Sequence, residues 1–297
     1  MEQTLPPGSG GEAGALAHAP DARELVFDRE FLFISIASDP VVAIPWFFRA
    51  RSQVGGVLRE RSAWIQRGGT WEALVQESEL GPTSRTPWRI LPGENLRLII
   101  GEDDDVEALF LRDGAVELET RLVDFLAEWM RQVGDPVRLF AGRSLSPSGP
   151  IEGYVLDLPR SWEAPGEASG DWIFLLSGTD LQLFLEEVPS PSESRIPTRY
   201  RGWSRSRLGD GEWSSLTVLW ENMRPFERAR RNIPSRWGIS SPGGEISGEL
   251  VSVNSYLSAG EGEGPILPVS GLFGVTGTLR IQGNMVSVAG VVRHVQR

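Results

Sequence analysis

The segment LTVLWENMRPF, residues 216–226, places an aromatic ring, a carboxylic acid and an amide at three successive positions, Trp220, Glu221 and Asn222. Alternate side chains of a strand point to opposite faces, so Trp220 and Asn222 share one face and Glu221 lies on the other. If the first face lines a cavity, Trp220 packs on a ligand and Asn222 binds a carbonyl. If Glu221 faces the cavity, the segment favours acid catalysis. The alternative, in which the segment has no chemical role, is that Glu221 is an exposed residue at the end of a strand.

The segment IPWFFRA, residues 44–50, is a second candidate for a binding surface. In a strand, Trp46 and Phe48 lie on one face and Arg49 lies on the opposite face. The chain holds 11 Trp. Because Trp combines a large apolar surface with one hydrogen-bond donor, it suits pocket walls as well as cores. We expect these three residues to contact a substrate.

The last 24 residues combine many glycines with an alternating apolar pattern. Gly283-Asn284 predicts a two-residue hairpin turn. That register places Gly277 opposite Gly290 on the apolar face, with His294 on the same face near the strand end. The paired glycines either let the strands coil sharply where a barrel closes, or leave room for a ligand or a large Trp. His294 is either a hydrogen-bonded structural residue or part of the site.

The inventory of side chains excludes several reaction classes. All 29 basic side chains are Arg, so Schiff-base chemistry and Lys bases are excluded. The chain has no Cys and only two His, His18 and His294, which argues against disulfides, thiolates, Ser-His-Asp triads and His-rich metal sites. General acid or base work falls to Asp, Glu or Tyr. Asp157 is one acid to consider, although a turn before Pro159 explains it equally simply. We expect no metal and no cofactor.

Charge and hydropathy limit the partners. The net charge of −11 repels nucleic acid. No run of 18 apolar residues occurs, so no stable membrane insertion is expected. The polar, Gly/Pro-rich N-terminus lacks the features of a signal peptide, and residues 1–22 are predicted to be a disordered tail. A cytoplasmic protein follows, and self-association into a homo-oligomer is left open.

Short alternating segments separated by Gly or Pro predict an all-β protein. Examples are residues 24–38, 41–52, 59–66, 70–80 and 171–188, with a hairpin turn at Asp113-Gly114. The one exception is residues 123–133. Leu122, Phe125, Leu126 and Trp129 recur at helical spacing there, which predicts one short helix.

A Gly/Ser/Pro-rich stretch near residue 145 predicts a linker between two domains. The domains expected are 23–145 and 146–297, and both begin with an aromatic-rich strand, a Ser-containing turn and a second apolar strand. Two antiparallel β-barrels of similar plan, packed side by side, account for this weak internal repeat.

The second half resembles the AttH/hydroxyneurosporene synthase group over residues 170–297. The similarity lies in DWIFLLSGTDLQLFLEE, in Pro234-Ser235-Arg236-Trp237, and in the spacing of Gly277, Gly283 and Gly290. Residues 24–130 resemble it more weakly. The resemblance implies two lipocalin-like barrels with a substrate pocket between them, and adds Trp172 and Trp237 to the expected substrate-binding residues. The group includes carotenoid 1,2-hydratases and decalin-forming Diels-Alderases.

Three functions fit the inventory and the resemblance. The first is a cofactor-independent cyclase that folds a hydrophobic polyene or polyketide intermediate of secondary metabolism into a reactive conformer, as a pericyclase does. The second is a hydratase or acid-type cyclase of a carotenoid or terpenoid, which requires one protonated acid in an apolar pocket. The third is non-catalytic binding of a hydrophobic small molecule. We favour an enzyme, with Glu221 and Asn222 as its catalytic residues.

Overall fold

The computed structural model describes residues 24–36, 41–53, 55–82, 93–102, 105–114, 116–131, 136–146, 149–164, 170–188, 198–207, 209–260 and 264–296. All of the regular structure in these ranges is β-strand, which confirms the all-β prediction. The expected tail, residues 1–22, lies outside the described residues. No helix in the described ranges is long and apolar enough to cross a membrane.

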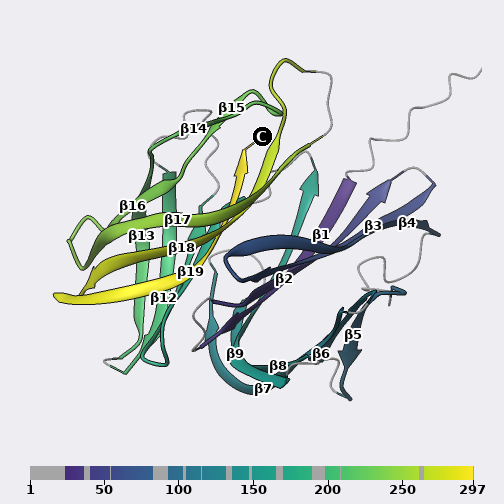
Figure 1. Ribbon diagram of the computed structural model, residues 1–297, viewed down its shortest axis with the longest axis horizontal. Helices are drawn as coiled ribbons and strands as arrows, with labels where there is room; N and C mark the ends of the chain where they lie inside the picture. Colours follow the sequence, from purple (N-terminus) through teal and green to yellow (C-terminus); the bar gives the residue numbers. More distant parts are fainter. Residues whose placement is uncertain are drawn as a thin grey trace, which may run out of the picture.

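The first unit is a nine-stranded antiparallel sheet that curls into an open barrel, with β4 and β5 as its two edges (Figure 1). The strand order is β4-β3-β2-β1-β9-β8-β7-β6-β5. The strands are β1 (Glu24–Ser35), β2 (Ala43–Gln53), β3 (Gly56–Arg67), β4 (Thr70–Gly81), β5 (Leu96–Ile100), β6 (Val106–Asp113), β7 (Val116–Trp129), β8 (Val137–Ser146) and β9 (Gly149–Ala164).

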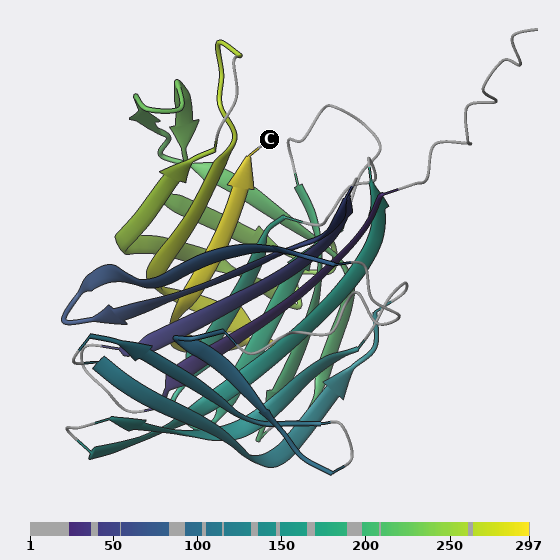
Figure 2. The same ribbon diagram turned by 90° about the vertical axis from the view of Figure 1, so that its right-hand side faces the viewer.

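The second unit is a closed eight-stranded barrel in the order β10-β11-β12-β13-β16-β17-β18-β19, which lies beside the first sheet (Figures 1 and 2). Its strands are β10 (Trp172–Ser177), β11 (Leu181–Glu187), β12 (Thr198–Ser206), β13 (Gly211–Glu221), β16 (Arg236–Ser240), β17 (Ile246–Ala259), β18 (Val269–Ile281) and β19 (Asn284–Gln296). A separate hairpin of β14 (Arg224–Phe226) and β15 (Arg231–Ile233) extends from one end of the barrel.

The prediction of a short helix is wrong. The segment expected to be helical lies largely in β7, where the pairing with β8 shifts between Leu122 and Asp124 and again between Phe125 and Ala127. Each bulge adds a residue to one strand, so it breaks the two-residue alternation and produces apolar spacings of three and four that imitate a helix. Phe125 is 59% exposed, and its ring contacts Phe140 of β8 at a centroid distance of 5.8 Å.

The expected domain boundary near residue 145 does not coincide with the division between the two sheets. The Gly/Ser/Pro-rich stretch is the hairpin between β8 and β9, with φ of +113° at Gly149 and the Ser146 hydroxyl donating to the Gly149 carbonyl over 3.0 Å. Because β9 pairs with β1 along its length, the first sheet continues to Ala164. Asp157 therefore lies within β9 rather than in a turn, and it accepts hydrogen bonds of 2.9 and 2.8 Å from Arg29.

The C-terminal hairpin has the expected faces but a different register. Its turn residues are Gln282 and Gly283, with φ of +49° and +85°, as a type I′ turn requires. Gly277 consequently pairs with Val288, and Gly290 pairs with Val275, so the two glycines are not opposite each other. The buried and exposed faces are as predicted, because the partner positions move by two residues and alternation is preserved.

The hydrophobic core has three layers because many strands are buried on both faces. In β10, Ile173 and Leu175 point into the closed barrel, whereas Trp172 and Phe174 point toward the first sheet. In β1, Phe31 and Phe33 likewise point into the open barrel. The middle layer joins the two barrels, and in it Phe184 stacks between Trp129 and Trp203 at centroid distances of 6.2 and 6.0 Å. Strands covered on both sides have nearly continuous apolar sequences such as WIFLL.

Gly290→Ala should destabilise the closed barrel by about 2 kcal/mol or more, as overpacking in a tight core does. A Cβ at this position would overlap the carbonyl oxygen of Phe174 on the neighbouring β10, which is backbone and cannot rotate away. Gly243→Ala is the matched control, since its Cβ meets only ordinary van der Waals contacts at 3.7 Å and beyond. Urea denaturation of both variants tests the prediction, which fails if they are equally stable.

Candidate functional site

A cavity of about 190 Å³ lies between the two barrels. One wall comes from β1, β2 and β3, and the other from β17, β18 and β19. These strands bring together residues separated by more than 200 positions, for example Trp64 and Arg293. The cavity is therefore a product of packing between the barrels, not of either barrel alone.

Aromatic rings form a continuous part of the cavity wall. The ring of Phe47 meets Trp64 edge to face at 5.3 Å, and Trp64 lies 5.9 Å from Tyr256 of the other barrel. The indole N–H of Trp64 and the hydroxyl of Tyr256 make no hydrogen bond with any described residue. Leu272 adds an apolar side chain to the same space. This side of the cavity suits a flat or unsaturated apolar ligand.

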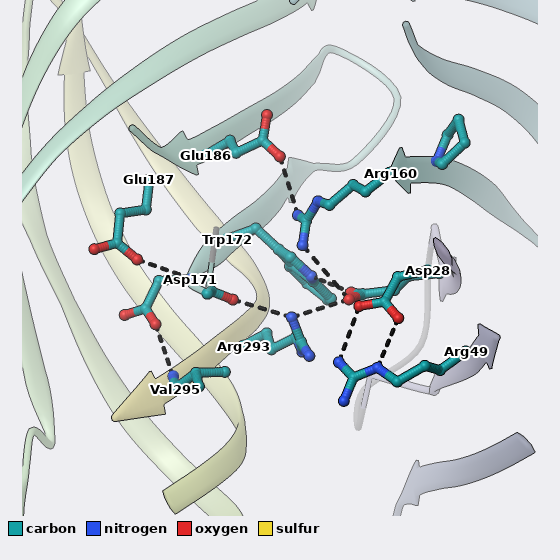
Figure 3. Close-up of polar contacts among 12 residues, drawn as sticks. Asp28, Arg49, Arg160, Asp171, Trp172, Glu186, Glu187, Arg293 and Val295 are labelled. Carbon is teal, nitrogen blue, oxygen red and sulfur yellow. Dashed lines mark hydrogen bonds and ion pairs between the residues drawn. The ribbon is translucent and has the colours of Figure 1, made fainter. Parts of the chain in front are cut away.

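A buried carboxylate, Glu30, forms the polar side. It is 2% exposed, and its Oε2 accepts a 2.6 Å hydrogen bond from the indole N–H of Trp172. Its Oε1 pairs with Nη1 of Arg293 at 2.9 Å and with Nη1 of Arg160 at 3.5 Å. Arg160 belongs to the open barrel, whereas Trp172 and Arg293 belong to the closed one (Figure 3). Glu30 therefore receives donors from both barrels.

A second carboxylate extends this cluster away from the cavity. Glu186 pairs with Arg131 at 2.8 Å and with Arg160 at 3.0 Å. Burial lowers the pKa of Arg131 and of Arg293 despite the neighbouring carboxylates. Burial also lowers the pKa of Arg160, but attraction from Glu30 and Glu186 more than offsets it, so that pKa is raised. The cluster is a desolvated network of charges that spans the interface.

At the cavity mouth, Arg49 forms a two-point pair with Asp28. Its Nε and Nη2 donate to the two carboxylate oxygens over 2.7 and 2.9 Å. The hydrogen bonds to Asp28 raise the pKa of Arg49 above its ordinary value. Such fork-to-fork geometry fixes the direction of the guanidinium. The Arg49 side chain is 38% exposed, so it also remains accessible from the solvent side.

Of the residues expected to bind substrate, Phe48 and Arg49 line this cavity. Trp172 lies directly behind its polar side, through the hydrogen bond to Glu30. Trp46 is fully buried inside the open barrel and does not line the cavity. Arg49 does lie on the face opposite Trp46 and Phe48, as alternation predicts.

The other aromatic candidates lie inside the closed barrel. Trp237 is fully buried there and packs against Phe273 at 5.1 Å. Trp220 meets the ring of His294 edge to face at 4.5 Å. None of these three candidates lines the cavity between the barrels. Gly277 and Gly290 do not line it either; both face the backbone of a neighbouring strand, as a sharply coiled barrel requires.

His294 belongs to a buried polar cluster. Its Nδ1 lies 2.6 Å from Oδ2 of Asp171, which also accepts from the Tyr200 hydroxyl over 3.3 Å. The amide nitrogen of Gln296 lies 3.0 Å from Nε2 of His294 and also donates to the Asn232 carbonyl over 3.1 Å. That amide orientation favours the tautomer with the proton on Nδ1. The cluster satisfies its own polar groups, as a structural network does.

The two residues expected to be catalytic lie at a chain turn away from the cavity. Asn222 has a positive φ of 50°, and its carbonyl accepts a 2.8 Å hydrogen bond from the Ser235 hydroxyl. The carbonyl of Glu221 accepts from the backbone N–H of Ser235 over 3.3 Å. The side chain of Asn222 is exposed, and that of Glu221 is half-buried. In this structure the segment ends β13 and leads into the β14–β15 hairpin.

Sequence reasoning missed most of the cavity. The residues it did not single out include Asp28, Glu30, Phe47, Glu60, Trp64, Tyr256 and Arg293. One signal was present: in VFDREFLF, residues 26–33, Asp28 and Glu30 occupy the same face as the buried Leu32. Two acids on an otherwise apolar face are costly to bury unless partners arrive from elsewhere in the fold, so they mark a polar site. The described residues contain no group of three or more His, Asp or Glu placed to hold a metal ion.

Comparison with known proteins shows a likeness in structure only. No family model matches the sequence, and no curated protein matches it. An AttH-like protein from Nitrosomonas europaea aligns over 98% of this chain and 99% of its own, with a TM-score of 0.60 and 12% identity.

Two further solved structures share the architecture. Kievitone hydratase from Nectria haematococca aligns over 90% of this chain and 88% of its own, with a TM-score of 0.53 and 11% identity. CghA, a Diels-Alderase, aligns over 91% and 88%, with a TM-score of 0.52 and 13% identity. The chain therefore has the AttH-like two-barrel fold, which confirms the predicted resemblance at the level of fold.

Glu30→Gln should lower the free energy of unfolding by about 3 kcal/mol or more, since removing one member of a buried ionic cluster leaves the others uncompensated. Glu249→Gln is the matched control: its pair with Arg236, at 3.3 Å, is solvent-exposed and should contribute less than about 1 kcal/mol. Denaturant titration of both variants measures the difference. Equal stability of the two would show that Glu30 does not hold the barrels together.

Stability should fall as the pH rises above about 10, the ordinary pKa of Tyr. Burial, with Asp171 nearby, raises the pKa of Tyr200 well above that value. Tyr200 thus stays protonated in the folded state while the unfolded chain ionises, which costs up to about 1.4 kcal/mol per pH unit.

Tyr200→Phe should flatten this alkaline slope more than Tyr154→Phe, because the pKa of Tyr154 is also raised by burial but less strongly. Urea midpoints measured from pH 8 to 11 test the prediction. Equal alkaline slopes in the wild type and Tyr200→Phe would contradict it.

Proposed function

We propose that this protein is a cofactor-independent cyclase, and that its substrate is a hydrophobic polyene or polyketide-type intermediate bound between the barrels. The observation that carries the proposal is the two-sided cavity. Phe47, Trp64 and Tyr256 offer apolar surfaces, and Arg49 and Arg293 offer hydrogen-bond donors from the two opposite walls of the same cavity. That the two-barrel fold also occurs in a hydratase and in a Diels-Alderase supports this general kind of activity.

The chemistry needs shape and polarisation rather than a nucleophile. Aromatic walls can hold a flexible polyene with its reacting carbons close together, which supplies part of the barrier reduction as orientation. Fixed N–H and O–H donors, including the Tyr256 hydroxyl, can stabilise charge that develops on a substrate carbonyl. We assign the site to a cytoplasmic enzyme of secondary metabolism.

Acid-catalysed hydration or cyclisation is the second candidate, and Glu60 favours it. This carboxylate lines the cavity, and Arg51 lies 3.6 Å away, beyond hydrogen-bonding distance. Asp28 and Glu30, by contrast, already accept hydrogen bonds at both oxygens. Glu60 is thus the cavity acid best placed to give a proton to an alkene.

Mass spectrometry of products separates the candidates. Carbonyl-bearing polyenes incubated with the protein should yield isomers of unchanged mass if it is a cyclase, and products heavier by one water if it is a hydratase. Conversion should fall at least about tenfold in Trp64→Ala, which removes an aromatic wall that orients the substrate. Glu60→Gln should change the rate less than about twofold, since general acid catalysis would cost about 100-fold or more.

Glu72→Gln is the control for charge alone, because Glu72 is exposed and pairs with Arg67 outside the cavity. Loss of conversion in Glu60→Gln but not in Glu72→Gln would replace the cyclase with the acid mechanism. If the polyenes quench Trp fluorescence but are not converted, only the third function, non-catalytic binding, remains.

A further inference from the structure

The polar side of the cavity contains guanidinium N–H groups that donate to no described residue. Nη1 of Arg293 donates to the Gly170 carbonyl over 3.0 Å and pairs with Glu30, but its Nε and Nη2 bond to no described residue. Nε and Nη2 of Arg49 donate to Asp28, and its Nη1 has no partner among the described residues. Arg293 and Arg49 both line the cavity, and Figure 3 shows them on either side of Asp28.

The carboxylates around this space already have partners. In the buried cluster two carboxylates, Glu30 and Glu186, face three guanidiniums, Arg131, Arg160 and Arg293. Asp28 and Arg49 neutralise each other. The remaining cavity acid, Glu60, is 42% exposed and has Arg51 as its own neighbour at 3.6 Å. Arg293 shares the carboxylate of Glu30 with Arg160, so its Nε and Nη2 remain available to a further acceptor.

The neighbouring surface determines what kind of anion fits. The guanidinium of Arg293 lies over the ring of Phe47, 5.1 Å from its centroid. Phe47 in turn contacts Trp64, which leads to Tyr256. A ligand that binds the guanidiniums and also fills the cavity therefore places an apolar body along these rings. A free inorganic anion would leave that aromatic surface unused.

We propose that Arg49 and Arg293 form an anion subsite, and that the ligand is an unsaturated apolar molecule carrying a carboxylate or an acidic enol. The inference rests on the proposed function, because it concerns the ligand of the same cavity. The acidic group accepts hydrogen bonds from N–H groups of both barrels. The apolar body extends toward Trp64 and Tyr256. The two guanidiniums set the orientation of the ligand, since a planar acid can accept from both.

Calorimetric titration with trans-cinnamate and with trans-cinnamamide tests the subsite. The two probes share an unsaturated aromatic body and nearly the same shape, but only cinnamate is charged. The wild-type protein should bind cinnamate at least about tenfold more tightly, as a charge-assisted hydrogen bond in a desolvated site implies. Raising the ionic strength should weaken cinnamate binding more than cinnamamide binding.

Arg293→Gln should remove the preference for cinnamate and leave cinnamamide binding unchanged. Because Arg293 is buried and this variant can fail to fold, Arg49→Gln provides an independent test at the cavity mouth. Arg51→Gln is the matched control: Arg51 lies on the same strand with the same 38% side-chain exposure but does not line the cavity. It should keep the full preference.

The outcomes distinguish this inference from the proposed function. Equal affinity for the two probes would overturn the anion subsite while leaving the cavity as an apolar binding site. A preference that survives in every folded variant at positions 49 and 293 would also overturn it. Failure of both probes to bind would contradict the ligand cavity itself, and with it the proposed function.

Discussion

The arrangement of the two barrels depends on the burial of Glu30. A carboxylate that is 2% exposed is stable only if donors surround it, and here they come from Arg160 of the open barrel and from Trp172 and Arg293 of the closed one. Separating the barrels would remove Trp172 and Arg293 from the buried carboxylate of Glu30. The ionic contact therefore fixes the relative position of the barrels as well as joining them. The stacked rings of the middle layer contribute buried apolar area, but the hydrophobic effect is non-directional and does not by itself specify how the two barrels are oriented.

The same contact creates the cavity. Apolar side chains of the middle core layer fill much of the space between the barrels. Where Asp28 and Glu30 replace apolar residues on β1, the opposite wall supplies Arg293 and the first sheet supplies Arg49. The cavity lies where this polar cluster meets the aromatic rings of Phe47, Trp64 and Tyr256. The candidate site is thus a consequence of the interaction that orients the barrels.

The features that could be predicted from the sequence are those set by local alternation. The strands, the all-β class and the two faces of the C-terminal hairpin follow from the spacing of apolar residues. Prediction failed where the backbone departs from regular pairing. The bulges in β7 imitate a helix, and the turn at Gln282-Gly283 shifts the partners of Gly277 and Gly290 by two positions. The bulges depend on how a strand coils against its neighbours, which local sequence does not specify. The turn position depends on Gln282 adopting a positive φ, which non-Gly residues seldom do.

The sequence by itself determined that many strands would be buried on both faces, because runs such as WIFLL and FLFI leave no polar face for water. It also placed Arg49 on the face opposite Trp46 and Phe48. Only the tertiary structure decided which aromatic residues line a cavity and which fill a core: Trp46, Trp220 and Trp237 lie inside barrels, whereas Trp64 and Tyr256 meet across the interface. The physical reason is that a strand's own sequence specifies its faces by alternation, while the partner of each face comes from a distant segment.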